Sequence, residues 1–223
     1  GALLGREKYV KLACPGGCAI GRRPIDMHIS AFEKMGAVIY EKENMLECRA
    51  ENITGSHIYL PFPSVGATEN IILASTLAKG TTVIINAARE PEISDLADFL
   101  NRCGARIYGA GDSTITVEGV SRLHSAEHSV IPDRIVASTY LIASAMTGGN
   151  ICLKDVIPSH LGPIIQPLRE SGCQVDVRGR NVSISSPKQL KRIKMIRTMP
   201  HPGFPTDVQA QMMALTTIAD GTS

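Results

Sequence analysis

The 223 residues include 43% apolar side chains and carry a formal net charge of +2, so the chain can bury a large core and has no strong charge bias towards a partner. The one dense basic stretch, residues 188–194, contains no aromatic residue, and the chain has no Trp, which argues against nucleic-acid binding. Six cysteines without close framework spacings, and no apolar run long enough to cross a bilayer, predict a cytoplasmic protein without disulfides or membrane insertion.

The first distinctive stretch in chain order is residues 14–26, with the sequence CPGGCAIGRRPID. Its glycines permit positive φ angles and a close approach of a ligand, and its prolines stiffen both ends. Arg22 and Arg23 favour a thiolate and attract anions, so Cys18 is the best candidate for a reactive residue. The alternative is a tight connection with an incidental cysteine. Metal binding is not predicted, because Cys14 and Cys18 have no second pair of ligands at metal-site spacing.

The rest of the chain is a tandem repeat with a period of about seventy residues. Residues 29–35 predict a helix that ends at Gly36, and residues 37–40 predict a strand; these match only the second half of the repeat, whose first half is missing or replaced. The first full unit follows. Its predicted elements are a helix at 67–79 ended by Gly80, a strand at 81–86, a helix at 92–103 ended by Gly104, and strands at 105–108 and 113–117.

A second full unit begins after a polar stretch at 124–129, which predicts a linker. Its predicted elements are a helix at 133–146, a strand at 151–153, a helix at 162–171, and strands at 173–176 and 181–185. A proline-rich run at 198–207 then precedes a third helix, 206–220, which ends at Gly221. The element order βαβαββ predicts a layered α/β fold, and the incomplete units at both ends predict an internal segment of a longer protein.

These residues resemble the enolpyruvyl transferases that act on UDP-N-acetylglucosamine, and the resemblance extends over essentially the whole chain. It rests on five motifs: residues 15–26 (PGGCAIGRRPID), 64–68 (SVGAT), 86–93 (NAAREPEI), 132–134 (PDR) and 201–207 (HPGFPTD). The resemblance implies an inside-out α/β barrel of βαβαββ repeats, with residues 1–130 in one domain and 131–223 in a second. It also implies missing N- and C-terminal parts that carry further active-site residues.

The reaction implied by the resemblance moves the enolpyruvyl group of phosphoenolpyruvate to the 3-hydroxyl of UDP-N-acetylglucosamine and releases phosphate. It is the first committed step of peptidoglycan biosynthesis, on which cell-wall biogenesis, cell shape and cell division depend, and it needs no cofactor. The family pattern gives Cys18 as the acid, which fosfomycin alkylates, and Asp207 as the base.

The same pattern implies a set of substrate-binding residues. Arg23, Pro24, Ile25, Asp26 and Met27 match the stretch that holds the uridine, and Ser64, Val65 and Gly66 match the segment that faces the diphosphate. Charged or polar positions lining the family's cleft are matched by Glu90, Asp133, Arg134 and His201.

Simpler roles remain open for several of these residues. Asp207 has the position of a helix N-cap, and the charged residues of the expected cleft are also compatible with salt bridges on loop surfaces. A 5-enolpyruvylshikimate-3-phosphate synthase-like transferase shares the repeat but lacks the cysteine loop. A non-catalytic module that binds a nucleotide sugar is the alternative from a different class, and the 223-residue chain by itself is expected to be inactive.

Overall fold

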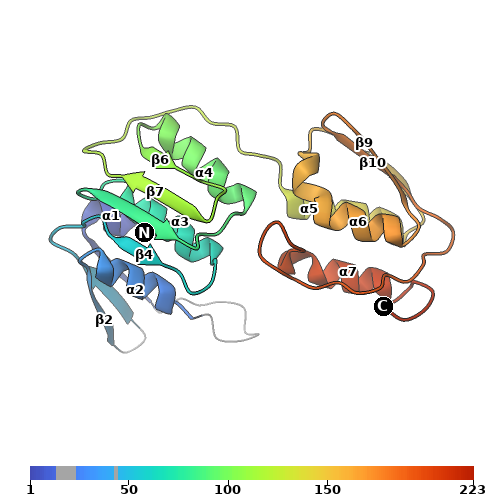
Figure 1. Ribbon diagram of the computed structural model, residues 1–223, viewed down its shortest axis with the longest axis horizontal. Helices are drawn as coiled ribbons and strands as arrows, with labels where there is room; N and C mark the ends of the chain where they lie inside the picture. Colours follow the sequence, from blue (N-terminus) through green and yellow to red (C-terminus); the bar gives the residue numbers. More distant parts are fainter. Residues whose placement is uncertain (14–23, 43–44) are drawn as a thin grey trace. The chain divides into compact units, whose positions relative to one another are not determined.

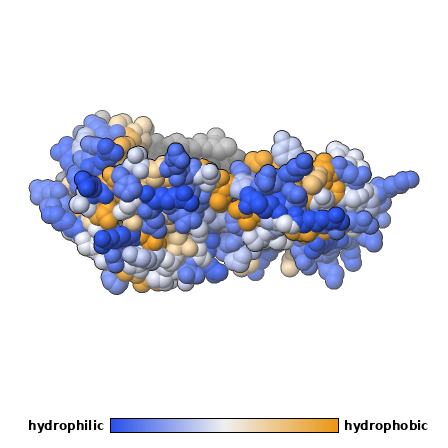
Figure 2. Space-filling model, turned by 90° about the horizontal axis from the view of Figure 1, so that it is seen from above, coloured by the Kyte–Doolittle hydropathy of each residue, from blue (hydrophilic) through white to orange (hydrophobic). Residues whose placement is uncertain are grey.

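The computed structural model describes residues 1–13, 24–42 and 45–223, which form two compact units, Gly1–Ser129 and Val130–Ser223 (Figure 1). Each unit has its own cluster of buried apolar side chains. On the face shown in Figure 2, polar residues predominate and apolar residues are scattered among them in both units. None of the described helices is long and apolar enough to cross a membrane.

Unit 1 contains one complete βαβαββ repeat. Its elements are β4 (His57–Tyr59), α3 (Val65–Ser75), β5 (Thr81–Ile85), α4 (Pro91–Arg102), β6 (Arg106–Tyr108) and β7 (Thr114–Glu118). The sheet order is β4-β5-β7-β6, in which β4 is parallel to β5 and β7 is antiparallel to both of its neighbours. The predicted repeat order is therefore confirmed in this unit, and the first strand, which has no range in the sequence prediction, is β4.

An incomplete repeat precedes it, formed by α1 (Ala2–Glu7), β1 (Tyr9–Ala13), α2 (Asp26–Lys34), β2 (Val38–Lys42) and β3 (Met45–Arg49). The order β1-β3-β2 is the counterpart of β5-β7-β6. The prediction that the first half of this repeat is missing or replaced is therefore wrong for α1 and β1, which are the counterparts of α3 and β5, whereas the described residues contain no counterpart of β4. The sequence gives little sign of α1 and β1, because Lys8, at φ 61°, ends α1 where the full units have a glycine.

Unit 2 contains α5 (Arg134–Met146), β8 (Asn150–Leu153), α6 (Gly162–Glu170), β9 (Gln174–Arg178), β10 (Asn181–Ser185) and α7 (Gln209–Thr216). Two short 3-10 helices, η1 (Pro158–Leu161) and η2 (Thr206–Val208), precede α6 and α7. The sheet order β8-β10-β9 repeats the pattern of unit 1. Around the basic stretch 188–194 the charged side chains are exposed, whereas Leu190 and Ile193 are buried in the core of this unit.

The helix α3 lies at the centre of unit 1 and contacts α1, α2 and α4 as well as β5 and β7 (Figure 1). Its side chains are buried on more than one face, as in Ala67, Ile71, Ile72 and Ala74, because helices rather than solvent surround it. The strands β5 and β7 alternate between buried and more exposed residues, so each sheet buries one face against the helices. Because α3 contacts both α2 and α4, residues at the N-terminal ends of these three helices are candidates for one functional site.

Candidate functional site

The N-terminus of α3 is built to receive an anion. Ser64 is its N-cap, and the Ser64 hydroxyl accepts a hydrogen bond from the backbone N–H of Ala67 at 3.3 Å. Ser64, Val65 and Gly66 are all only partly buried. Because the first N–H groups of a helix have no acceptor within it, and the helix dipole favours negative charge there, this terminus can bind a phosphate group.

The first turn of α2 packs against this terminus. A Cβ atom on Gly66 would lie 3.6 Å from Cε1 and 3.8 Å from Nε2 of the His28 imidazole. Asp26 and Met27 belong to the same turn of α2, so the structure brings the predicted uridine stretch and the predicted diphosphate segment together. Burial lowers the pKa of His28, which favours the neutral ring.

Within the predicted uridine stretch the apolar and polar residues have different environments. Ile25 and Met27 pack against the core of unit 1, whereas Pro24 and Asp26 are exposed. Asp26 is the first residue of α2, where a negative charge complements the helix dipole. The apolar residues therefore anchor the stretch, and the exposed ones are available to a ligand.

A buried threonine fixes the loop that leads to α4. The Thr68 hydroxyl accepts a hydrogen bond from the Ala88 N–H at 3.0 Å and donates one to the Ser64 carbonyl at 2.8 Å. The loop is held further by the Asn86 side-chain amide, which donates to the Leu60 carbonyl at 2.8 Å. The loop is thereby tied to the first turn of α3.

This arrangement sets carboxylates near the same end of unit 1. Glu90 is 8% exposed and lies at the N-cap position of α4, and Glu92 is in the first turn of that helix. Burial, and then the charge of Glu92, raises the pKa of Glu69 on α3. The sequence analysis does not include Glu69 among the candidate site residues. Its place on a predicted helix, about one and a half turns beyond Ser64, could have indicated it.

In unit 2 the structure gives Asp133 a defined local role. Its Oδ1 atom accepts hydrogen bonds from the N–H groups of Ile135 at 2.7 Å and Val136 at 3.0 Å, so Asp133 is the N-cap of α5. Arg134 follows as the first residue of the helix. The helix α5 also contacts η2 and α7, and Gln211 of α7 donates a hydrogen bond to the Thr139 hydroxyl of α5 at 3.0 Å.

The proline-rich run that precedes η2 forms a closed turn. The Met199 N–H donates to the Phe204 carbonyl at 2.9 Å, and the Gly203 N–H donates to the Pro200 carbonyl at 2.8 Å. Phe204 is buried in the core of unit 2, which anchors the turn, and His201 lies at its tip with intermediate exposure.

Asp207 lies within η2 and is exposed. The alternative role as a helix N-cap is wrong, because Pro205 caps η2 and Val208 caps α7. Among the residues that the structure describes, the Asp207 carboxylate has no hydrogen bond or ion pair. No described residue therefore prevents the Asp207 side chain from contacting a ligand.

Cys18 and Arg23 lie outside the described residues, as does Arg22. The site residues that the structure does describe fall into two groups, with Pro24, Ile25, Asp26, Met27, Ser64, Val65, Gly66 and Glu90 in unit 1 and Asp133, Arg134, His201 and Asp207 in unit 2. In the described ranges no group of three or more His, Cys, Asp or Glu residues could hold a metal ion.

Solved structures share the repeat fold of this chain. The enolpyruvyl transferase NikO from Streptomyces tendae matches 98% of this chain and 53% of its own with a TM-score of 0.82 at 21% sequence identity. An EPSP synthase from Acinetobacter baumannii matches 87% of this chain and 46% of its own with a TM-score of 0.61, also at 21% identity. The chain therefore has an enolpyruvyl transferase-like α/β fold.

The family profile of EPSP synthase (3-phosphoshikimate 1-carboxyvinyltransferase) matches residues 1–223, so the chain belongs to this family. Two similar relatives are UDP-N-acetylglucosamine 1-carboxyvinyltransferases 1 and 2 of Caldanaerobacter subterraneus subsp. tengcongensis. They are 52% and 50% identical to the chain over 223 residues, which is all of the chain and 54% of each relative. The chain thus spans about half the length of the curated relatives that it matches.

Proposed function

We propose that the protein to which this chain belongs transfers the enolpyruvyl group of phosphoenolpyruvate to the 3-hydroxyl of UDP-N-acetylglucosamine. The observation that carries the proposal is the 50–52% identity over the whole chain to relatives named for this activity. The cysteine loop favours it over transfer to shikimate 3-phosphate. The corresponding biological role is the first committed step of peptidoglycan biosynthesis, and through it cell-wall biogenesis, cell shape, the cell cycle and division.

Two protons move in the addition step of this reaction, and a third moves when phosphate leaves. In the addition step an acid protonates the methylene carbon of phosphoenolpyruvate while a base removes the proton of the sugar 3-hydroxyl, whose oxygen bonds to the central carbon. Loss of phosphate and of a proton from the new methyl group then restores the double bond. We assign Cys18 as the acid and Asp207 as the base. The exposed Asp207 carboxylate and its anchored turn support the second role.

Binding roles follow the same logic. The anion-binding terminus of α3 suits the diphosphate of a nucleotide sugar, and the adjoining first turn of α2 suits its uridine. The exposed Asp26 and the buried Glu90 supply acceptors for hydroxyl or amide groups of the ligand. Asp133, Arg134 and His201 would contribute polar contacts from unit 2.

A cytoplasmic location is part of the proposal, and the cysteines support it. Cys48, Cys103, Cys152 and Cys173, the cysteines that the structure describes, are all free thiols. The 223-residue chain by itself is proposed to be inactive, because about half of the relatives' length lies outside it. Residues 1–130 and 131–223 would then be parts of two domains that the remaining chain completes.

The test is intact-mass spectrometry after fosfomycin treatment, with and without UDP-N-acetylglucosamine, alongside a phosphate-release assay. In the complete protein we expect one adduct on Cys18 that forms faster with the sugar nucleotide, and no adduct at that site in Cys18→Ser. The exposed Cys152 is the internal control for simple thiol accessibility. Phosphate release with shikimate 3-phosphate but not with UDP-N-acetylglucosamine would overturn the proposal, and binding without turnover would favour a non-catalytic module.

A further inference from the structure

The segment that leaves unit 1 is fastened first to the C-terminal end of α3 and then to α4. After β7, the Val120 N–H donates to the Thr76 carbonyl at 2.9 Å, and the His124 N–H donates to the Cys103 carbonyl at 2.9 Å, at the C-terminal end of α4. The segment then runs back along the helix towards its N-terminal end. We call residues 124–128 the strap.

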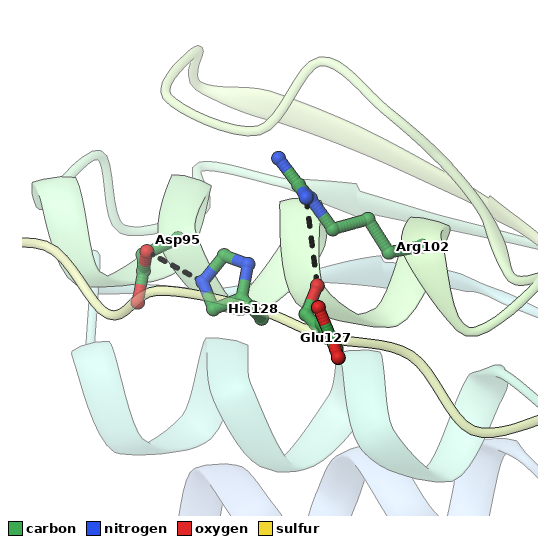
Figure 3. A network of polar contacts seen from close by, with 4 residues as sticks. All are labelled: Asp95, Arg102, Glu127 and His128. Carbon is green, nitrogen blue, oxygen red and sulfur yellow. Dashed lines mark hydrogen bonds and ion pairs between the residues drawn. The ribbon is translucent and has the colours of Figure 1, made fainter.

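Figure 3 shows the two side-chain contacts that hold the strap. Arg102 Nη1 donates to the Glu127 carbonyl at 3.5 Å, a weak contact, and His128 Nε2 lies 2.9 Å from Asp95 Oδ1. The His128 ring also packs on Phe99, with 5.6 Å between the ring centroids. The imidazole is therefore held by one polar and one aromatic contact, both from α4.

The contact between His128 and Asp95 is well shielded from water. The two side chains are 11% and 14% exposed, whereas the side chains of a surface ion pair of unit 1, Arg106 with Glu118, are 64% and 45% exposed. A hydrogen bond to a charged group in such a place contributes more than a solvated surface pair does. His128 is thus the strongest attachment point of the strap.

The geometry also selects one form of the ring. His128 Nδ1 is buried and has no hydrogen-bond partner among the described residues. A proton on Nδ1 would therefore be buried without an acceptor, whereas a proton on Nε2 is donated to Asp95. Of the two tautomers, the one with its hydrogen on Nε2 is therefore the one that fits.

Attachment ends immediately after His128. In the described parts of the chain, residues 129–132 have no hydrogen bond to another residue, and Val130 is 77% exposed. The next anchored residue, Asp133, caps α5 in unit 2. We propose that the contact of His128 with Asp95 is a clasp that holds the strap on α4, so that unit 1 extends as far as His128 and the connection to unit 2 begins only after this residue. This inference is independent of the proposed function.

Cleavage by the glutamate-specific protease Glu-C after Glu127 tests the clasp in the 223-residue chain. The protease needs a released segment, so the initial rate follows the population of the opened strap when reclosing is fast. We expect Asp95→Ala to raise this rate about tenfold, which corresponds to about 1.4 kcal/mol. Asp95→Asn keeps an acceptor for the Nε2 hydrogen and should change the rate by less than about threefold.

Asp98→Ala is the matched control, because Asp98 is an exposed acid on the same helix. Equal rates for Asp95→Ala and Asp98→Ala, at unchanged circular dichroism, would overturn the proposal. If Asp95→Ala fails to fold, nitrogen-15 NMR of His128 in the unaltered chain decides the question. A single ring form with a hydrogen on Nε2 supports the clasp, and a ring with the tautomer mixture of a free histidine refutes it.

Discussion

Three buried threonines of unit 1 offer one substitution, threonine to valine, in three different hydrogen-bonding situations. Thr68, Thr76 and Thr82 are 0%, 2% and 0% exposed. Valine has nearly the shape of threonine, so each change removes a hydroxyl and leaves the packing almost unaltered. The three free energies of unfolding therefore compare the hydroxyls themselves.

Thr68→Val should be the most damaging change. It leaves the buried N–H of Ala88 without its acceptor, which costs about 1–3 kcal/mol, whereas the Ser64 carbonyl keeps the backbone N–H of residue 68 as a donor. We expect a loss of about 2–3 kcal/mol, or a fall of roughly 5–10 °C in the unfolding temperature. The same change loosens the loop that carries Glu90.

Thr76→Val is the matched control. The Thr76 hydroxyl donates to the Ile72 carbonyl at 2.9 Å, but that carbonyl also accepts the backbone N–H of residue 76. No buried group is left unpaired, so we expect a loss of about 0.5–1 kcal/mol. The Thr82 hydroxyl is buried without a partner among the described residues, so Thr82→Val should be neutral or stabilise by about 1 kcal/mol.

Urea unfolding followed by tyrosine fluorescence measures these differences. The signal reports mainly unit 1, which contains every tyrosine except Tyr140. If Thr68→Val is no more destabilising than Thr76→Val, the threonine is not what holds the loop against α3, and the account of the site in unit 1 fails.

Three further predictions concern charge, backbone conformation and capping. Burial and the charge of Glu92 raise the pKa of Glu69 from its ordinary value of 4.5, so the folded state loses stability as the pH rises from 4.5 through the raised pKa. Glu69→Gln should therefore stabilise unit 1 at pH 7–8, and this gain should vanish below pH 4.5. Urea unfolding measures the gain, and a gain that does not change with pH would contradict the prediction. Lys8→Gly removes a side chain from a residue with a positive φ angle and should raise the stability of unit 1 by about 0.5–1 kcal/mol. A loss of stability would show that the hydrogen bond from the Lys8 ammonium group to the Gly5 carbonyl stabilises unit 1 by more than the φ angle costs. Asp133→Ala removes the N-cap of α5 and should lower the stability of unit 2 by about 1 kcal/mol in thermal unfolding. Asp133→Ser keeps a capping oxygen and should restore most of this stability. An Asp133→Ala variant as stable as the parent would refute the capping role.

Local sequence signals determined the elements that recur. Gly36, Gly104 and Gly172 are evenly spaced along the chain, and each ends the second helix of its repeat at a φ angle of 95–96°. Glycine pays no steric penalty in this conformation, and helical and strand periodicity are equally local properties. The βαβαββ order and the family motifs could therefore be found from the residues alone.

Contacts between segments far apart in the chain were decided by the tertiary structure. The packing of His28 against Gly66, the hydrogen bond from Ala88 to Thr68, and the clasp of His128 on Asp95 join residues whose separate sequence environments give no signal of pairing. The same holds for α1 and β1, which Lys8 concealed because its positive φ angle is maintained by the surrounding fold. Periodicity and helix caps depend on neighbours along the chain, whereas hydrogen bonds and burial between distant elements arise only after those elements have packed.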